Sequence, residues 1–271
     1  MEEHVSQLTQ WFNHILGPMA LSLLHTMGLQ PADYEHPIPE YLVMSLIVLV
    51  LCTILALILR SQLSVERPGA LQQGAELLLT NPLGFGVKDL LDENAGHGSE
   101  KYIPFVGSVS LFVLFSNLLS VFPAFSSPTG NAIVPLGCAI LTFLYFNYHG
   151  FRHHGVGGYL KHFAGPMPAL SPLIFPVEII STSARILSLT VRLWANIFAS
   201  DLIYMIFLGL LIAPVQWGWS KSPVLGILFA VFPAVIPILF VGLHIFVSII
   251  QAYVFTVLPS IYLGQAVAEE H

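Results

Sequence analysis

The sequence predicts an all-α polytopic membrane protein with about five membrane-spanning helices, an amphipathic surface helix and two final long helices that form a strongly tilted hairpin. The first observation behind this prediction is composition. The 271 residues are 55% hydrophobic and only 9% charged, with a mean hydropathy of +0.79, whereas a soluble domain carries about 25% charged residues. The second is that several long segments contain no charged residue at all, and about 20 apolar residues are enough for a helix to cross a bilayer.

Residues 1–39 are predicted to form an external N-terminal segment, which contains no Lys or Arg. Apolar side chains recur there at steps of three and four residues, at Leu8, Phe12, Leu16, Met19 and Leu23. This spacing predicts a short helix on the membrane surface, with a possible kink at Gly17-Pro18. The uncharged residues 41–59 then predict the first membrane span.

Residues 40–170 are predicted to hold the N-terminal transmembrane helices and their cytoplasmic loops. Residues 60–101 form a polar connector, with helical amphipathicity at 70–79 and a solvated loop expected over DLLDENAGHGSE. Residues 102–151 contain no Asp, Glu, Lys or Arg but are interrupted by FPAFSSPTGN. They therefore predict two helices, over 102–122 and 132–149, joined by a turn. A second polar loop is expected over residues 149–170.

The third region, residues 171–271, is predicted to be a long-helix hairpin. Segments 171–213 and 223–265 each exceed forty residues and lack a polar turn at the middle. As helices each would be ~60 Å long, about twice the ~30 Å hydrocarbon core of a bilayer. We therefore expect tilted helices rather than pairs of short spans, with possible kinks in the second at Pro233, Pro237 and Pro259.

The basic residues predict the orientation of the chain. With five spans, the loops at 60–101 and 149–170 lie on the same side of the membrane as the C-terminus. These two loops contain six of the nine basic residues. The opposite side holds only Lys221. The positive-inside rule therefore puts the N-terminus outside and the C-terminus in the cytoplasm. The six are Arg60, Arg67, Lys88, Lys101, Arg152 and Lys161.

Several other classes of function find little support in the sequence. No basic patch indicates a nucleic-acid partner, and the acidic first residues do not predict a cleavable signal peptide. Cys52 and Cys138 fall in apolar spans and are interpreted as small buried hydrophobes. GVGG at 155–158 lacks the GK[ST] of a phosphate loop. We predict no cofactor and no metal site.

One rival interpretation is a metal-dependent membrane hydrolase, because four histidines lie within fourteen residues, at His149, His153, His154 and His162. They lack an HExxH pattern and a nearby acid. Solvated loop histidines are the preferred interpretation.

The main functional signal is a set of five ionisable residues in the two long apolar segments: Glu178, Arg185, Arg192, Asp201 and His244. An arginine at membrane depth costs about 2.5–3.5 kcal/mol or more, and it cannot lose its proton. Arg192 is therefore a functional-site candidate that needs a partner.

Spacing sorts these residues by helix face. Glu178, Arg185 and Arg192 are seven residues apart and share a face with a drift of about 20° per step. Asp201 is nine residues beyond Arg192, about half a turn round the helix, so it does not neutralise Arg192 but can meet His244. Gln251 is seven residues past His244 on the other segment. Carboxylate, imidazole and guanidinium groups at membrane depth are the parts of a proton relay. The alternative interpretation is that these residues only form polar contacts that hold the helices together.

The stretch SLTVRLWANIFASDL resembles the signature of subunit a of the F-type ATP synthase. In that signature an Arg is followed by Leu, an aromatic, a small residue and Asn (here Asn196), with an acidic residue nine after the Arg. LHIFVSIIQAYVFTVLPSIYL extends the resemblance, with His and a Gln seven later. Glu178, Arg185 and Ser188 also fit upstream, and SNLLSVFP is similar to the end of a middle span in the family.

The resemblance implies a proton-translocating stator subunit of a bacterial inner-membrane ATP synthase, with two offset half-channels that load and unload protons on a rotating ring of c-subunits. It implies that Arg192 faces the ring carboxylate. It places Asp201, His244 and Gln251 in or near the outer half-channel, and Glu178 and Ser188 toward the cytoplasmic exit. Further partners implied are the b-subunit peripheral stalk, other ATP synthase subunits and membrane lipid. The chain is then not catalytic alone, since ATP chemistry belongs to partner subunits.

The chain departs from the family pattern at three positions. Ser200 and Asp201 stand where Gly and Glu are more usual, and Ser120 stands where some relatives have Asp, so Ser120 is given no role. The shorter Asp201 leaves a gap of one methylene that a water or a different pose of His244 must fill. His244 and Asp201 favour a proton over sodium as the coupling ion. A proton-coupled secondary transporter is the alternative function, although it predicts inverted repeats and no internal repeat is evident.

Overall fold

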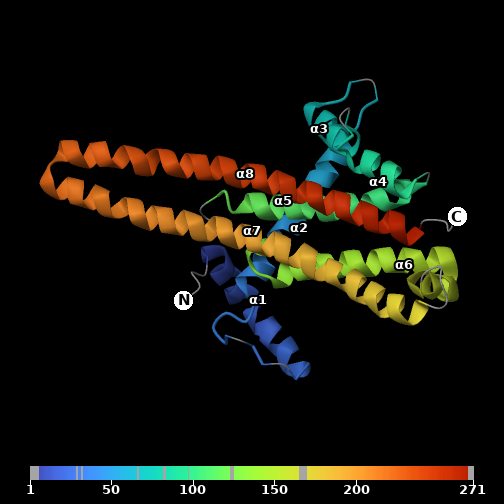
Figure 1. Ribbon diagram of the computed structural model, residues 1–271. Helices are drawn as coiled ribbons and strands as arrows, with labels where there is room; N and C mark the ends of the chain where they lie inside the picture. Colours follow the sequence, from blue (N-terminus) through green and yellow to red (C-terminus); the bar gives the residue numbers. More distant parts are fainter. Residues whose placement is uncertain are drawn as a thin grey trace.

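The computed structural model describes residues 6–28, 30–31, 33–65, 67–81, 84–96, 98–122, 125–164 and 170–267. Within these ranges the side chains of residues 160–164, 208, 211, 228 and 231–237 are not described. Every regular element in these ranges is helical (Figure 1).

Eight α-helices and two short 3₁₀ helices make up the described part of the chain. Five segments in it are long and apolar enough to cross a membrane: Glu40–Ser61, Ser99–Leu119, Ile133–Tyr159, Ser171–Lys221 and Ile238–Val267. The predicted class, an all-α polytopic membrane protein, is confirmed. The elements are α1 (Gln7–Thr26), α2 (Glu40–Ser61), α3 (Ala70–Leu79), α4 (Val87–Ala95), η1 (Ser99–Tyr102), α5 (Ile103–Leu119), η2 (Pro128–Gly130), α6 (Ile133–Ala164), α7 (Ser171–Lys221) and α8 (Pro223–Val267).

Helices α7 and α8 form the predicted long hairpin, which extends well beyond the rest of the bundle (Figure 1). Their 51 and 45 residues correspond to ~75 and ~70 Å of helix. Ser222 is the one residue between them, and its hydroxyl accepts the Leu225 N–H at 3.2 Å, so it caps α8. A Cβ at Gly226 would lie 2.6 Å from the Trp219 ring. Glycine there therefore lets the two helices approach closely at the turn.

Helix α5 is fixed against α8 by buried hydroxyl groups. Thr256 Oγ1 donates to Ser110 Oγ at 2.8 Å, and Ser110 Oγ donates to the Ala252 carbonyl at 2.9 Å. Unpaired polar groups are costly in a bilayer, so these hydrogen bonds hold the two helices in one alignment.

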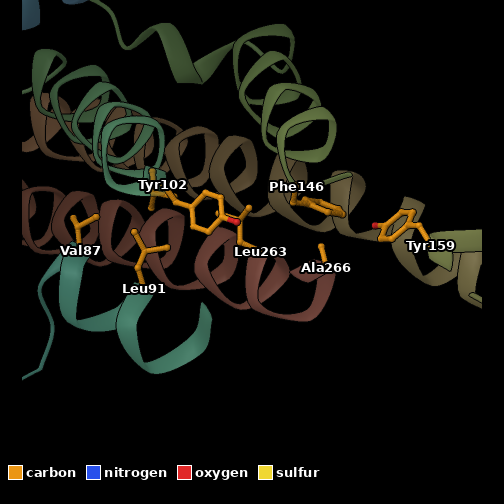
Figure 2. Packing of buried hydrophobic residues seen from close by; sticks show 8 residues of the cluster. Val87, Leu91, Tyr102, Phe146, Tyr159, Leu263 and Ala266 are labelled. Atoms are coloured by element: carbon orange, nitrogen blue, oxygen red, sulfur yellow. The ribbon is translucent and has the colours of Figure 1, made fainter. Parts of the chain in front are cut away.

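A hydrophobic cluster joins five elements, α4, η1, α5, α6 and α8, at the C-terminal end of α8. Leu263 and Ala266 of α8 pack with Leu91 of α4, Tyr102 of η1 and Phe146 of α6 (Figure 2). A second cluster lies further along the hairpin, where α5, α6, α7 and α8 meet. The two clusters fix the hairpin against the shorter spans.

The N-terminal segment agrees with the predicted surface helix. Helix α1 is unbroken through Pro18, and its exposed apolar residues include Trp11, Met19 and Leu23. Asn13 ties it to the entry of α2, because its amide donates to the Ile38 carbonyl at 3.0 Å and accepts the Ile38 N–H at 2.9 Å.

The expected solvated loop over residues 89–100 is wrong. Residues 87–95 form α4 and residues 99–102 form η1. Leu90 and Leu91 are buried, and α4 packs so closely on α8 that a Cβ at Gly264 would lie 2.1 Å from the Asn94 carbonyl oxygen. Burial of Val87 and Leu91 in the cluster with α8 outweighs the polar composition of this short segment.

The second expected polar loop, over residues 149–170, is also wrong as far as residue 164. Helix α6 continues to Ala164 with a break at Gly155, whose φ is 70°. Beyond the break, the Tyr159 hydroxyl donates to Asn147 Oδ1 at 3.1 Å, and its ring lies so close to Gly150 that a Cβ there would be 2.4 Å away. The chain therefore folds back on α6, because a buried tyrosine anchors it.

We expect Gly264→Ala to destabilise the packing of α4 on α8, because the added methyl group meets a backbone carbonyl that cannot move freely. Overpacking of this kind costs about 1–3 kcal/mol. The midpoint of thermal unfolding of the purified protein in detergent should fall. Gly107→Ala is the matched control, because a Cβ at Gly107 meets nothing within 4 Å. Equal midpoints for the two variants would contradict the close approach.

Candidate functional site

Arg192 lies on the outward face of α7, in a helix that its neighbours orient. Leu189, Leu193 and Ile197 recur every four residues and are buried against the bundle. Arg192 lies outside this stripe and is exposed, and Val191 beside it is 45% exposed. Its Nη2 donates to Ser188 Oγ at 3.3 Å. In the described part of the chain, no carboxylate forms an ion pair with the guanidinium.

The other two residues of the predicted stripe are less exposed than Arg192. Arg185 is half-buried, with its guanidinium 4.6 Å from the centre of the Tyr262 ring and 6.0 Å from that of Phe146. A cation at about 6 Å or less over an aromatic face is attracted by the ring. Glu178 is also half-buried. Arg185 is thus held by α6 and α8, and Arg192 is the cation of the stripe that faces outward.

His244 connects three helical segments through its two ring nitrogens. Nδ1 lies 3.0 Å from Ser200 Oγ on α7. Nε2 lies 3.0 Å from Ser120 Oγ and 3.0 Å from the Asn117 carbonyl oxygen, both at the end of α5. The imidazole is therefore fixed at the meeting point of α5, α7 and α8.

Asp201 lies near His244 without bonding to it. The two side chains interact electrostatically, but in the part of the chain that is described they form neither a hydrogen bond nor an ion pair. The carboxylate instead borders η2, where a Cβ at Gly130 would lie 4.0 Å from Asp201 Oδ2. Asp201 is thus near His244 but does not contact it through a hydrogen bond. Ser200 makes the hydrogen bond from α7 to the ring, at Nδ1.

Gln251 and Asn196 each carry a buried polar atom without a hydrogen-bond partner among the described residues. These atoms are Gln251 Oε1 and Asn196 Nδ2. Gln251 belongs to α8 and Asn196 to α7. Along the hairpin, both residues lie between the Ser200–His244 contact and the cluster that contains Leu193 and Phe255. Most buried polar groups in proteins are paired, so two unpaired amide atoms on one helix interface mark it as unusual.

Residues at the end of α5 were missed as site residues by the sequence reasoning. Asn117 is fully buried, and its Oδ1 accepts from Thr129 Oγ1 at 2.6 Å. Ser127 Oγ donates to the Ser116 carbonyl at 3.0 Å. These bonds hold η2 against α5, next to Asp201. The signal was present in SNLLSVFP, but the roles of Asn117 and Ser120 depend on which helix that segment meets.

The histidine group at the end of α6 has a different setting. His149 packs against the rings of Tyr102 and Tyr145 at 4.9 and 4.6 Å. No three His, Cys, Asp or Glu side chains in the described part are grouped as metal ligands, and the side chain of His162 lies outside that part. Cys52 and Cys138 are both free; Cys138 is buried as expected, whereas Cys52 is only half-buried.

Together these features define a multi-pass helical membrane protein with ionisable residues along one long hairpin. Comparison with known sequences then gives its family. The profile described as ATP synthase A chain matches residues 41–264, and the chain belongs to this family. Its bacterial relatives and its five apolar helices support a multi-pass protein of a bacterial membrane.

Three relatives show how far the likeness extends. ATP synthase subunit a of Solibacter usitatus is 40% identical over 260 residues, which cover 96% of this chain and 100% of that protein. ATP synthase subunit a of Koribacter versatilis is 38% identical over 271 residues, with 99% of each chain covered. That of Aquifex aeolicus is 38% identical over 198 residues, which cover 72% of this chain and 85% of that protein. The similarity thus spans nearly the whole chain, as the motifs predicted.

Thr129→Val should destabilise the junction between η2 and α5, because it leaves the buried Asn117 amide without its hydroxyl partner. An unsatisfied buried group costs about 1–3 kcal/mol. Thermal unfolding of the purified protein measures the loss. Thr53→Val is the control, because Thr53 is exposed and bonds only to the Leu49 carbonyl of its own helix. If Thr53→Val lowers the stability as much as Thr129→Val does, the hydrogen bond between Thr129 and Asn117 does not stabilise the junction.

Proposed function

We propose that this chain is the proton-translocating stator subunit of an F-type ATP synthase, and that Arg192 faces a rotating ring of c-subunits. The observation that carries the proposal is an exposed arginine at membrane depth with no carboxylate partner in the described part of the chain. A permanent charge there is costly, and a carboxylate on another subunit offsets that cost. Family membership supports the same assignment.

The charge of Arg192 then determines the order of events. A deprotonated carboxylate facing lipid is very costly, so a ring site leaves Arg192 only after it has taken up a proton. Protonation therefore precedes each rotation step, and proton flow turns the ring. The membrane potential supplies about 2.3 kcal/mol per charge for each 100 mV.

The outer half-channel is proposed to lie along the interface between α7 and α8, on the hairpin side of Arg192. It contains Asp201, His244, Asn196 and Gln251. The unpaired amide atoms of Asn196 and Gln251 support this location, because a buried polar site with two or more partners is suited to hold a water molecule. Waters there would continue the path from His244 toward the ring.

The second half-channel is proposed to leave toward the cytoplasm past Glu178 and Ser188. Both residues precede Arg192 on α7, in the direction of the helix start that adjoins the loop from α6. Ser188 also holds the guanidinium through its hydroxyl. The long hairpin suits two offset channels, because a single pair of tilted helices can present both to one curved ring surface.

The remaining partners and the orientation follow from the same assignment. The b-subunit peripheral stalk and other ATP synthase subunits are the expected protein partners, with ATP chemistry on partner subunits and lipid around the spans. The chain serves as a channel component and is not catalytic alone. The alternative, a proton-coupled secondary transporter, predicts helices broken at the midplane, whereas α7 is one helix of 51 residues.

Arg192→Ala should abolish proton-driven ATP synthesis in vesicles that carry the reconstituted complex, because a ring carboxylate would have no cation to meet. Arg60→Ala removes an arginine from the last turn of α2 and should leave synthesis within about twofold of wild type, as is usual for surface substitutions. Retention of synthesis by Arg192→Ala would refute the assignment.

The proposed orientation places the α7–α8 turn outside and α3 in the cytoplasm. Single cysteines at Lys221 and Gln73, both exposed, test it in a chain whose own two cysteines are replaced by alanine. A membrane-impermeant maleimide should label Lys221→Cys in intact cells and Gln73→Cys only in inverted vesicles. The reverse pattern would mean that the chain is inserted the other way round.

A further inference from the structure

Two of the departures from the family pattern, Ser120 and Ser200, meet at one side chain. Ser120 comes from the end of α5 and Ser200 from α7, and each hydroxyl lies 3.0 Å from a different ring nitrogen of His244. Nothing in the sequence connects these two serines, since they are eighty residues apart. The imidazole lies between two hydroxyl groups, but their chemical settings differ.

The Nε2 side of the ring favours a bound proton. The Asn117 carbonyl oxygen, 3.0 Å from Nε2, can accept a hydrogen bond and cannot donate one. The Ser120 hydroxyl donates to the same carbonyl at 3.1 Å, so its oxygen is left to accept as well. A bare Nε2 would face the lone pairs of two oxygens, and repulsion therefore favours Nε2–H.

The Nδ1 side of the ring can exchange a proton. When the imidazole is neutral with Nε2–H, the Ser200 hydroxyl donates to Nδ1. When the imidazole is charged, Nδ1–H donates to Ser200 Oγ, because a hydroxyl can rotate and serve in either role. Both states keep a 3.0 Å contact with Ser200, so a proton can be gained or lost at Nδ1 while Nε2 keeps its own.

We propose that His244 takes up and releases its proton at Nδ1, with Ser200 as the positioning residue for that exchange, while Asn117 and Ser120 keep Nε2 protonated. This rests on the proposed function of the chain as a proton channel. Each cycle adds one proton to a neutral ring and removes the same proton, so no other reactant is needed. The ring is then a proton store that opens toward α7 rather than a relay from one nitrogen to the other.

The charges around the ring agree with exchange on this side. On α7, Asp201 follows Ser200 and interacts electrostatically with His244. The α5 residues from 103 to 119 include no titratable side chain, and on α8 the nearest hydrogen-bonding neighbour of His244 is Ser248, which donates to its carbonyl at 2.7 Å. Asp201 is therefore the carboxylate that can attract or receive the proton, and it belongs to α7, the helix that also supplies Ser200.

Two serine substitutions at the same ring separate this arrangement from its rival. In vesicles with the reconstituted complex, Ser200→Ala should lower the rate of proton-driven ATP synthesis about tenfold, the factor that a hydrogen bond to a charged group is worth. Ser200→Thr keeps the hydroxyl and should restore most of the rate. Ser120→Ala tests the other side of the ring and should lower the rate less than Ser200→Ala does, because the Asn117 carbonyl still holds Nε2–H.

The other outcomes each overturn the proposal. A loss with Ser120→Ala as large as with Ser200→Ala would indicate a relay through the ring, and no loss with either would indicate a packing role. An equal loss with Ser200→Ala and Ser200→Thr would show that shape matters and the hydroxyl does not.

Nitrogen NMR of the membrane-embedded complex gives a readout that does not depend on transport. With ¹⁵N-labelled histidine, and His244→Gln to assign the signal by difference, the neutral ring should show a protonated Nε2 and a bare Nδ1. The opposite tautomer would refute the proposal. If Arg192→Ala retained synthesis, the proposed function would fail while this tautomer could still be measured, so the two failures are distinguishable.

Discussion

The permanent charge of Arg192 is the constraint on which the rest of this structure depends. A guanidinium cannot be neutralised by loss of its proton, and burial among the apolar side chains of its own bundle would leave it unpaired. The stripe of Leu189, Leu193 and Ile197 instead faces the core and leaves Arg192 on the outer side of α7. Arg185, seven residues earlier, is held by aromatic rings of α6 and α8. The chain thus holds one of the two cations by internal packing and leaves the other on its outer face.

The alignment of the α7–α8 hairpin matters equally, because it decides which polar groups meet. The single-residue turn at Ser222 and the close approach at Gly226 fix the start of the alignment. The Ser110–Thr256 hydrogen bond then fixes α5 against α8. Given both, Ser200 faces one nitrogen of His244 and the end of α5 faces the other. A shift of one helical turn in either contact would separate these groups by about 5.4 Å and break the hydrogen bonds.

Composition and periodicity predicted the spans well and the short polar elements between them poorly. A charge-free run of sufficient length in a chain this apolar has few alternatives to a helix, because only helices satisfy their own backbone in lipid. Polar segments carry no such constraint. Residues 89–100 and 149–170 were expected as loops, yet α4 forms because Val87 and Leu91 pack in the cluster with α8, and α6 continues because Tyr159 packs back on Gly150. These contacts join distant parts of the chain, and no local pattern reveals them.

Composition, charge-free segments and motifs were enough to predict the class, the long apolar helices, the hairpin, the family and the ionisable residues within the two long apolar segments. Helical spacing also separated Asp201 from Arg192, because rotation about a helix axis is set by residue number. Contacts between helices place Asp201 beside η2, hold Arg185 against aromatic rings and bring Asn117, Ser120 and Ser200 around His244. The physical reason is that spacing fixes the face on which a residue lies. Which neighbour covers that face, and at what height, depends on packing between helices.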